Sequence, residues 1–163
     1  MFSKIPTTTL LYITGILVSV SATIHADNLN TSGIVCRNYI AAEVKDIDYT
    51  ASGVTNIAVD YRYIICPIPR SPINSGPVAE FFVDGFNTGN TSTTCTVMIH
   101  DYSGNFKTST TFTEAGDTPG RAWDHAVFFN TTNQLTKYDY VSMYCSIPGN
   151  KQSVIYGITA VQP

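Results

Sequence analysis

The sequence predicts an all-β domain, a sandwich or jelly-roll-like fold of about eight antiparallel strands held by two disulfides. The chain after residue 26 is rich in Thr, Val, Ile, Tyr and Phe, which favour strands, and it shows almost no helical periodicity. Gly, Asn, Asp, Ser or Pro interrupts it every 8–14 residues, a spacing typical of short strands joined by turns. The expected strands are 34–44, 58–66, 78–84, 93–101, 106–113, 122–130, 139–147 and 153–161, with a short extra strand near 47–50.

Alternation within two of these strands indicates which side chains face the core. Cys95 shares a face with Val97 and Ile99, and Cys145 shares a face with Met143. Successive side chains of a strand point to opposite faces, so both cysteines are expected on apolar, inward faces.

Four cysteines, Cys36, Cys66, Cys95 and Cys145, are spaced 30, 29 and 50 residues apart. An even number of cysteines in an exported chain indicates disulfides, whereas a zinc site would need closely spaced pairs. Three pairings are compatible with the sequence. We favour Cys36–Cys66 with Cys95–Cys145, and we expect no metal or other cofactor.

The N-terminus, residues 1–26, is typical of a secretory signal peptide. Its apolar core, Leu10–Val20, is too short for a membrane span, which needs about 20 residues. Cleavage after Ala26 is expected, with Ala22 as the alternative. The product would be a single domain, residues 27–163, secreted to the periplasm or the exterior, with no membrane span.

Charge excludes one class of partner. Without the signal peptide the chain has 8 basic and 12 acidic side chains, a net charge of −4, and no basic patch. Nucleic-acid binding depends on neutralising phosphates with lysine and arginine, so we expect no nucleic-acid partner. A glycan or another envelope or extracellular protein remains as the expected partner.

Tyrosines are the main candidates for a binding surface. Tyr138, Tyr140 and Tyr144 alternate on the face opposite Cys145, and Tyr61 and Tyr63 share a face of an earlier strand. A tyrosine combines an apolar ring with a hydrogen-bonding tip, which suits contact with sugars or proteins. If these faces are exposed, the five rings would form a flat platform. The same rings would otherwise serve as cross-strand packing.

Two histidines offer a weaker case for catalysis. His100 adjoins Asp101 and His125 adjoins Asp124, but adjacent strand residues point to opposite faces. A general base needs an orienting acid within hydrogen-bond reach, and a triad also needs a nucleophile. A small hydrolase using His100 or His125 is therefore an alternative and not the main interpretation.

The segment Asp84–Asn90 has oxygen-bearing side chains at alternating spacing. It lacks the final glutamate of a calcium-binding EF-hand loop. We therefore interpret the glycine- and asparagine-rich part after Asp84 as a turn, with no metal.

Four short motifs resemble a loose group of small secreted bacterial proteins with four similarly spaced cysteines. The motifs are Gly53-Val-Thr-Asn56, Ile64-Ile-Cys-Pro-Ile-Pro-Arg70, Ser92-Thr-Thr-Cys-Thr-Val97 and Tyr144-Cys-Ser-Ile-Pro148. The resemblance implies a secreted, disulfide-bonded β-protein over most of the chain. It implies no function.

The sequence thus favours a non-catalytic, secreted β-sandwich that acts as a surface binding or structural module. A carbohydrate-binding module with a tyrosine platform is the first alternative, and the histidine-based hydrolase is the second. A structural module would have an unpaired edge strand, or a free N-terminal segment around Asp27–Gly33 that completes the sheet of a neighbour.

Overall fold

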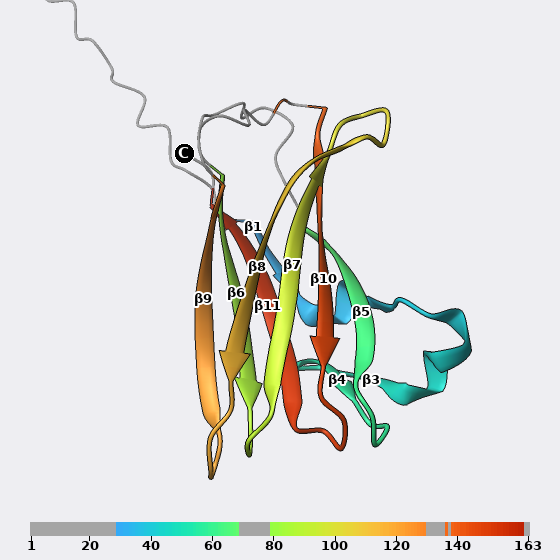
Figure 1. The fold of residues 1–163 in the computed structure, drawn as a ribbon, viewed down its shortest axis with the longest axis vertical. Coiled ribbons are helices and arrows are strands. Elements are labelled where there is room, and N and C mark those ends of the chain that lie inside the picture. The colour runs from blue at the N-terminus through green and yellow to red at the C-terminus, as the bar shows by residue number, and fades with distance from the viewer. Residues whose placement is uncertain (1–28, 69–78, 130–135, 137, 162–163) are drawn as a thin grey trace, which may run out of the picture.

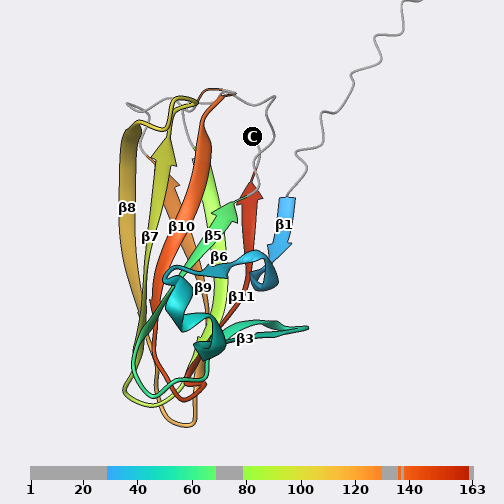
Figure 2. The same ribbon diagram turned by 90° about the vertical axis from the view of Figure 1, so that its right-hand side faces the viewer.

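A computed structural model describes residues 29–68, 79–129, 136 and 138–161. These residues form two antiparallel sheets packed face to face, which confirms the predicted β-sandwich (Figures 1 and 2). The six-stranded sheet has the order β3 (Ile47–Thr50), β4 (Gly53–Asn56), β11 (Ser153–Val161), β6 (Ala79–Asn87) and β9 (Arg121–Phe129), with β1 (Leu29–Ser32) also paired to β11. The five-stranded sheet has the order β2 (Arg37–Asn38), β5 (Arg62–Ile68), β10 (Tyr140–Ile147), β7 (Ser92–His100) and β8 (Phe106–Ala115).

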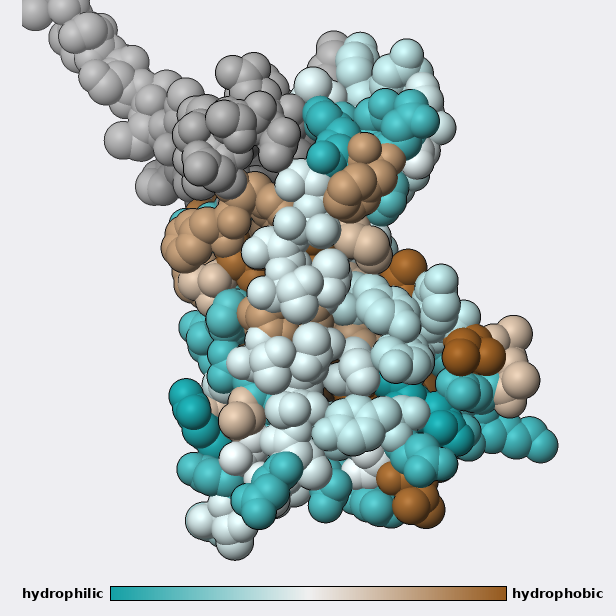
Figure 3. All heavy atoms as spheres, viewed as in Figure 1, coloured by the Kyte–Doolittle hydropathy of each residue, from teal (hydrophilic) through white to brown (hydrophobic). Residues whose placement is uncertain are grey.

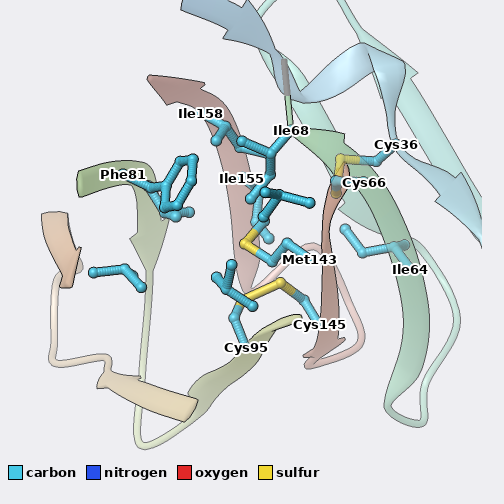
Figure 4. Close-up of a cluster of buried hydrophobic side chains, with 14 of the residues drawn as sticks. Cys36, Ile64, Cys66, Ile68, Phe81, Cys95, Met143, Cys145, Ile155 and Ile158 are labelled. Carbon is cyan, nitrogen blue, oxygen red and sulfur yellow. A yellow bond between two sulfur atoms is a disulfide. The ribbon is translucent and has the colours of Figure 1, made fainter. Parts of the chain in front are cut away.

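The core lies between the inner faces of the two sheets. Met143 and Ile64 of the five-stranded sheet meet Phe81, Ile155 and Ile158 of the six-stranded sheet, and all five are buried (Figure 4). β7 and β10 alternate between buried and partly exposed side chains, as the sequence predicted. Burial of these apolar side chains at about 25 cal/mol per Å² is the main force that joins the sheets.

Both favoured disulfides are present. Cys95 of β7 is bonded to Cys145 of β10, and Cys36 is bonded to Cys66 of β5. All four cysteines are fully buried. The expected pairing and the expected inward placement are therefore confirmed.

The expected strand 34–44 is wrong. Its residues form two 3-10 helices, η1 (Gly33–Val35) and η2 (Ala41–Asp46), on either side of the two-residue strand β2. The chain pairs with the six-stranded sheet through β1, crosses to the five-stranded sheet through β2, and returns through β3. Because the segment passes from one sheet to the other within a few residues, it bends through the two 3-10 helices and closes one edge of the sandwich (Figure 2).

The N-terminal segment is not free where the structure describes it. β1 pairs antiparallel with β11, from Leu29 opposite Ala160 to Ser32 opposite Gly157. The idea that this segment completes the sheet of a neighbour is therefore corrected, because its hydrogen bonds are used within the same chain.

Other expected strands differ mainly in their limits. β4 was not expected, whereas the extra strand at 47–50 is confirmed as β3. The strand expected at 58–66 begins only at Arg62, and β6 continues to Asn87, three residues into the expected turn. The predicted signal peptide lies outside the described residues. No helix among the described residues is long and apolar enough to cross a membrane.

β4 shows why a short polar stretch can be a strand here. All of its residues are buried, including Thr55 and Asn56. The Thr55 hydroxyl donates to the Ser153 carbonyl, and the Asn56 amide donates to the carbonyls of Asp60 and Ile147. Buried polar groups are tolerated when they are hydrogen-bonded in this way.

Replacing Cys95 and Cys145 together with alanine should lower the free energy of unfolding by about 4 kcal/mol, because the bridge closes a 50-residue separation. Urea denaturation under non-reducing conditions measures the change. The corresponding Cys36/Cys66 double variant opens a 30-residue separation and should lose somewhat less. A loss below about 1 kcal/mol for the first variant would contradict the expectation.

Candidate functional site

The outer face of the five-stranded sheet has no charged side chain at the described outward positions of its three central strands, β5, β10 and β7, or of the Ser109–Ala115 part of β8. Alternation of burial along the strands identifies these positions. They are Tyr63, Ile65, Pro67, Ser92, Thr94, Thr96, Met98, His100, Ser109, Thr111, Thr113, Ala115, Tyr140, Ser142, Tyr144 and Ser146. At the two margins of the face, Phe106 lies opposite His100, and Arg37 of β2 lies opposite Ile65 with its guanidinium donating to the carbonyls of Ile34 and Cys36. The space-filling view shows this face as largely pale, with the hydrophilic residues gathered near its margins (Figure 3).

The aromatic rings of this face lie in two groups and not in one flat platform. We call Tyr102, Tyr138, Tyr140, His100 and Phe106 the terminal cluster, because they surround the end of β7 and the start of β10. We call Tyr39, Tyr63 and Tyr144 the central cluster. The predicted residue Tyr61 belongs to neither, since it makes no ring contact with another described aromatic residue.

A pocket of about 300 Å³ opens at the terminal cluster, and Tyr102 and Tyr138 are the described residues that line it. Their ring centroids are 6.3 Å apart and their planes meet at 70°. The two side chains are 77% and 61% exposed, which is unusual for large aromatic groups that pack against each other. The pocket therefore presents apolar ring surface to the solvent.

His100 supports the inner side of the same cluster. Its imidazole stacks on Tyr140 at 5.4 Å, and Phe106 meets it edge-on at 5.9 Å. The Tyr140 hydroxyl reaches the neighbouring turn, where it lies 3.6 Å from the place that a Cβ on Gly104 would occupy. The rings thus support one another and the turn that carries Tyr102.

Asp101 fixes the turn that holds Tyr102. One carboxylate oxygen accepts hydrogen bonds from the backbone amides of Ser103 and Asn105, at 2.8 and 2.9 Å. The other oxygen accepts one from the Asn105 side chain at 3.0 Å. The Asn105 bonds are the main cause that lowers the pKa of Asp101. Asp101 therefore starts the turn that follows β7.

Asp139 fixes the segment that holds Tyr138. Its side chain is 2% exposed and forms an ion pair with Lys107 at 2.7 Å. The backbone amide and the hydroxyl of Thr136 donate to it at 2.7 and 3.0 Å. Burial alone would raise the pKa of Asp139, but the hydrogen bonds from Lys107 and Thr136 outweigh burial and lower it. Each wall of the pocket is thus anchored by its own aspartate.

Tyr144 is the covered member of the central cluster. Tyr63 stacks on it at 5.2 Å with nearly parallel planes, and Tyr39 meets it edge-on at 4.9 Å. Burial, followed by the neighbouring Tyr63 and Tyr39, raises the pKa of the Tyr144 phenol. Tyr63 and Tyr39 are the exposed members.

The two histidines lie in different environments. His100 lies in the terminal cluster and its Nδ1 is buried without a hydrogen-bond partner. His125 of β9 faces inward at one edge of the sandwich, where its Nδ1 lies 2.6 Å from Glu114 and its ring stacks on Phe112. The sequence neighbour Asp124 is therefore not its partner, and no described serine, threonine or cysteine hydrogen-bonds it.

The turn that the sequence indicated after Asp84 is shorter than expected and is confined to the end of the segment, at Gly89 and Asn90. Asp84 to Asn87 continue β6, so their side chains alternate between the two faces of the sheet and do not converge. Asn87 is buried, with its amide donating to the Glu114 carbonyl and its oxygen accepting from Thr93. Within the described part of the chain, no group of three or more His, Cys, Asp or Glu is placed to hold a metal.

Sequence reasoning missed Tyr39, Tyr102 and Phe106. Tyr102 could have been predicted from the alignment of β7 with β10 that the Cys95–Cys145 disulfide sets. Cys95 lies directly opposite Cys145, and His100 lies directly opposite Tyr140. Continuing two residues further along each chain brings Tyr102 level with Tyr138. Tyr39 gave no such signal, because its segment was expected to be a strand.

Replacing Asp139 with asparagine should lower the free energy of unfolding at pH 7 by about 1.5–3 kcal/mol, because a charge-assisted network is lost. The lowered pKa of Asp139 means that its carboxylate stabilises the fold above the ordinary aspartate pKa of about 3.9. This contribution is lost as the pH falls through the lowered value.

Denaturation of both proteins from pH 7 to pH 2 measures the effect, and the difference between them should shrink towards the acid end. Asp48→Asn is the matched control, because its contact with Lys151 is long and exposed. An equal difference at all pH values would contradict this role for the Asp139 carboxylate.

No protein-family model matches the chain, and no curated protein matches it. Its fold is similar to the native structure of a family 35 carbohydrate-binding module from Clostridium thermocellum, with a TM-score of 0.53 and 14% identity over 85% of this chain and 100% of that chain. A xylan-binding module, CBM15, matches with a TM-score of 0.41 and 13% identity, over 84% and 97% of the two chains. TmCBM61, solved in complex with β-1,4-galactotriose, matches with a TM-score of 0.39 and 11% identity, over 83% and 88%. The first of these likenesses shows that the chain has the β-sandwich fold of a carbohydrate-binding module.

Proposed function

We propose that this chain is an exported, non-catalytic carbohydrate-binding module whose terminal cluster holds the sugar. The observation that carries the proposal is the pocket between the exposed rings of Tyr102 and Tyr138. The likeness in fold to a carbohydrate-binding module supports it.

The chemistry of the pocket suits a sugar. A pyranose ring has apolar C–H faces and a rim of hydroxyl groups. Tyrosine rings offer apolar surface, and their phenol groups donate and accept hydrogen bonds. A binding site that combines apolar walls with a few polar groups is typical for small ligands. The terminal cluster provides both kinds of surface.

The anchoring of the pocket reduces the cost of binding. Asp101 holds the turn of Tyr102, and Asp139 holds the segment of Tyr138, each through three hydrogen bonds or ion pairs. Side chains that are already ordered lose less conformational entropy when a ligand binds. This favours a binding function over a passive surface.

The placement of the histidines favours binding over hydrolysis. His125 faces inward between the sheets, whereas the pocket lies at the terminal cluster, on the outer side of the five-stranded sheet. His100 packs as a ring between Tyr140 and Phe106. The pocket therefore has no described pair of a general base and a nucleophile beside it.

Replacing Tyr102 or Tyr138 with alanine should weaken glycan binding by about tenfold or more, because each substitution removes one wall of the pocket. A glycan array on the mature protein identifies a ligand, and isothermal titration calorimetry measures the affinity. Tyr156→Ala is the matched control, since Tyr156 is an exposed tyrosine on β11 of the other sheet.

The control variant should bind as the wild type does. Phenylalanine at either position keeps the ring and should retain most of the affinity. If the wild type binds no glycan on the array, or if the alanine variants bind equally well, the proposed function is wrong.

A further inference from the structure

We propose that the glycan is a neutral, linear chain that runs from the terminal cluster along β10 to the central cluster. The proposal rests on the proposed function and adds a second aromatic contact and a substrate class to it. It predicts a binding surface several sugar units long, with Tyr63 and Tyr39 at its far end.

The two clusters are aligned on one strand. Tyr140 belongs to the terminal cluster and Tyr144 to the central cluster, and both point outward from β10. Four residues separate them, which corresponds to about 13 Å along a strand. This distance exceeds the size of a single sugar ring, so only an oligosaccharide can contact both clusters at once.

The path between the clusters is open to a flat ligand. Ser142 is the outward residue of β10 between Tyr140 and Tyr144, and it pairs with Met98 of β7 and Pro67 of β5. Serine is small, and none of the three is charged. The aromatic side chains therefore stand at the two ends of a lower, uncharged strip.

Paired threonine hydroxyls lie beside the central-cluster end of this strip, level with Tyr144 and with Ser146. Thr94 and Thr113 are 2.9 Å apart, and Thr96 and Thr111 are 2.8 Å apart, across β7 and β8. In each pair one hydroxyl donates to the other, which leaves one hydroxyl hydrogen and several lone pairs unused. Thr96 is directly opposite Tyr144, so these groups lie beside the proposed path and can bind sugar hydroxyls.

The central cluster is built as a firm support. Tyr144 is held between Tyr63 and Tyr39, and the backbone amide of Tyr39 donates to the Tyr63 carbonyl at 2.8 Å. The Cys36–Cys66 disulfide ties the segment before Tyr39 to β5. Tyr63 and Tyr39 are thus held in place while they remain exposed for contact with a ligand.

The charge of the surface selects among glycans. The strip between the two clusters has no lysine or arginine at the described outward positions of β5, β10 and β7, and Arg37 lies beyond it on the edge strand β2. A polymer of uronic acids would bring one carboxylate per unit to this strip, where at most the unit nearest Arg37 could meet a cation. Desolvating an unpaired charge is costly, so a neutral chain is favoured.

Calorimetry with oligosaccharides of two and six units tests the inference. The probes are cello-, xylo- and mannooligosaccharides, with oligogalacturonides as the anionic comparison. The six-unit neutral chain should bind the wild type about tenfold more tightly than the two-unit chain, because only it reaches the second cluster.

Tyr63→Ala should remove most of the roughly tenfold gain in affinity of six units over two and leave the affinity for two units unchanged. Tyr102→Ala should weaken the binding of both the two-unit and the six-unit chains. Tyr63→Phe retains the ring and should keep the gain, and thermal unfolding of each variant reports whether it is folded. If two and six units bind equally, if Tyr63→Ala leaves the gain intact, or if oligogalacturonides bind better, the inference is overturned while the terminal pocket stands. If none of the sugars binds the wild type, the proposed function itself fails.

Discussion

The Cys95–Cys145 disulfide is the constraint on which the candidate site depends. It joins two residues that lie directly opposite each other on β7 and β10, so it fixes how these strands align. A slip of one residue would exchange the inner and outer faces of a strand. With the bridge in place, Met143 stays in the core, and Tyr140 and Tyr144 stay outside. The same alignment brings the turn after β7 next to the segment before β10, which creates the pocket.

The two faces of the five-stranded sheet follow different rules. Its inner face is a mainly apolar layer that includes both disulfides, with Thr93 at one end hydrogen-bonded to Asn87 and Ser153 of the facing sheet. Its outer face combines rings and hydroxyls, with no charge at the described outward positions of the three central strands β5, β10 and β7. Nothing in the packing of the core requires the outer face to have this composition. Uncharged, ring-bearing surface is costly to leave exposed to water, and its extent is better explained by a ligand than by stability.

The sequence predicted the second half of the fold well and the first part poorly. From Ser92 onward, strong alternation and clear turns give strands close to those observed. The segment 34–44 has the composition of a strand, but Ile34, Tyr39 and Val44 are exposed in a segment that crosses between the sheets. Only the tertiary arrangement decides whether such a segment forms a strand or a crossing between the sheets. The site followed the same division: Tyr138 and Tyr140 were candidates, whereas Tyr39 became one only when the Cys36–Cys66 bridge placed it beside Tyr63.

The pairing of β1 with β11 has a mechanical consequence. The strands are antiparallel, with Leu29 beside Ala160, so tension applied to the two ends of the sandwich pulls them apart from one end. Hydrogen bonds in this geometry break one after another and offer little resistance. Peeling would stop at Cys36, whose bond to Cys66 shields the intervening loop from the load. A module held by a sugar chain at one surface and pulled from its termini would therefore extend by a short, defined length and keep its binding face intact.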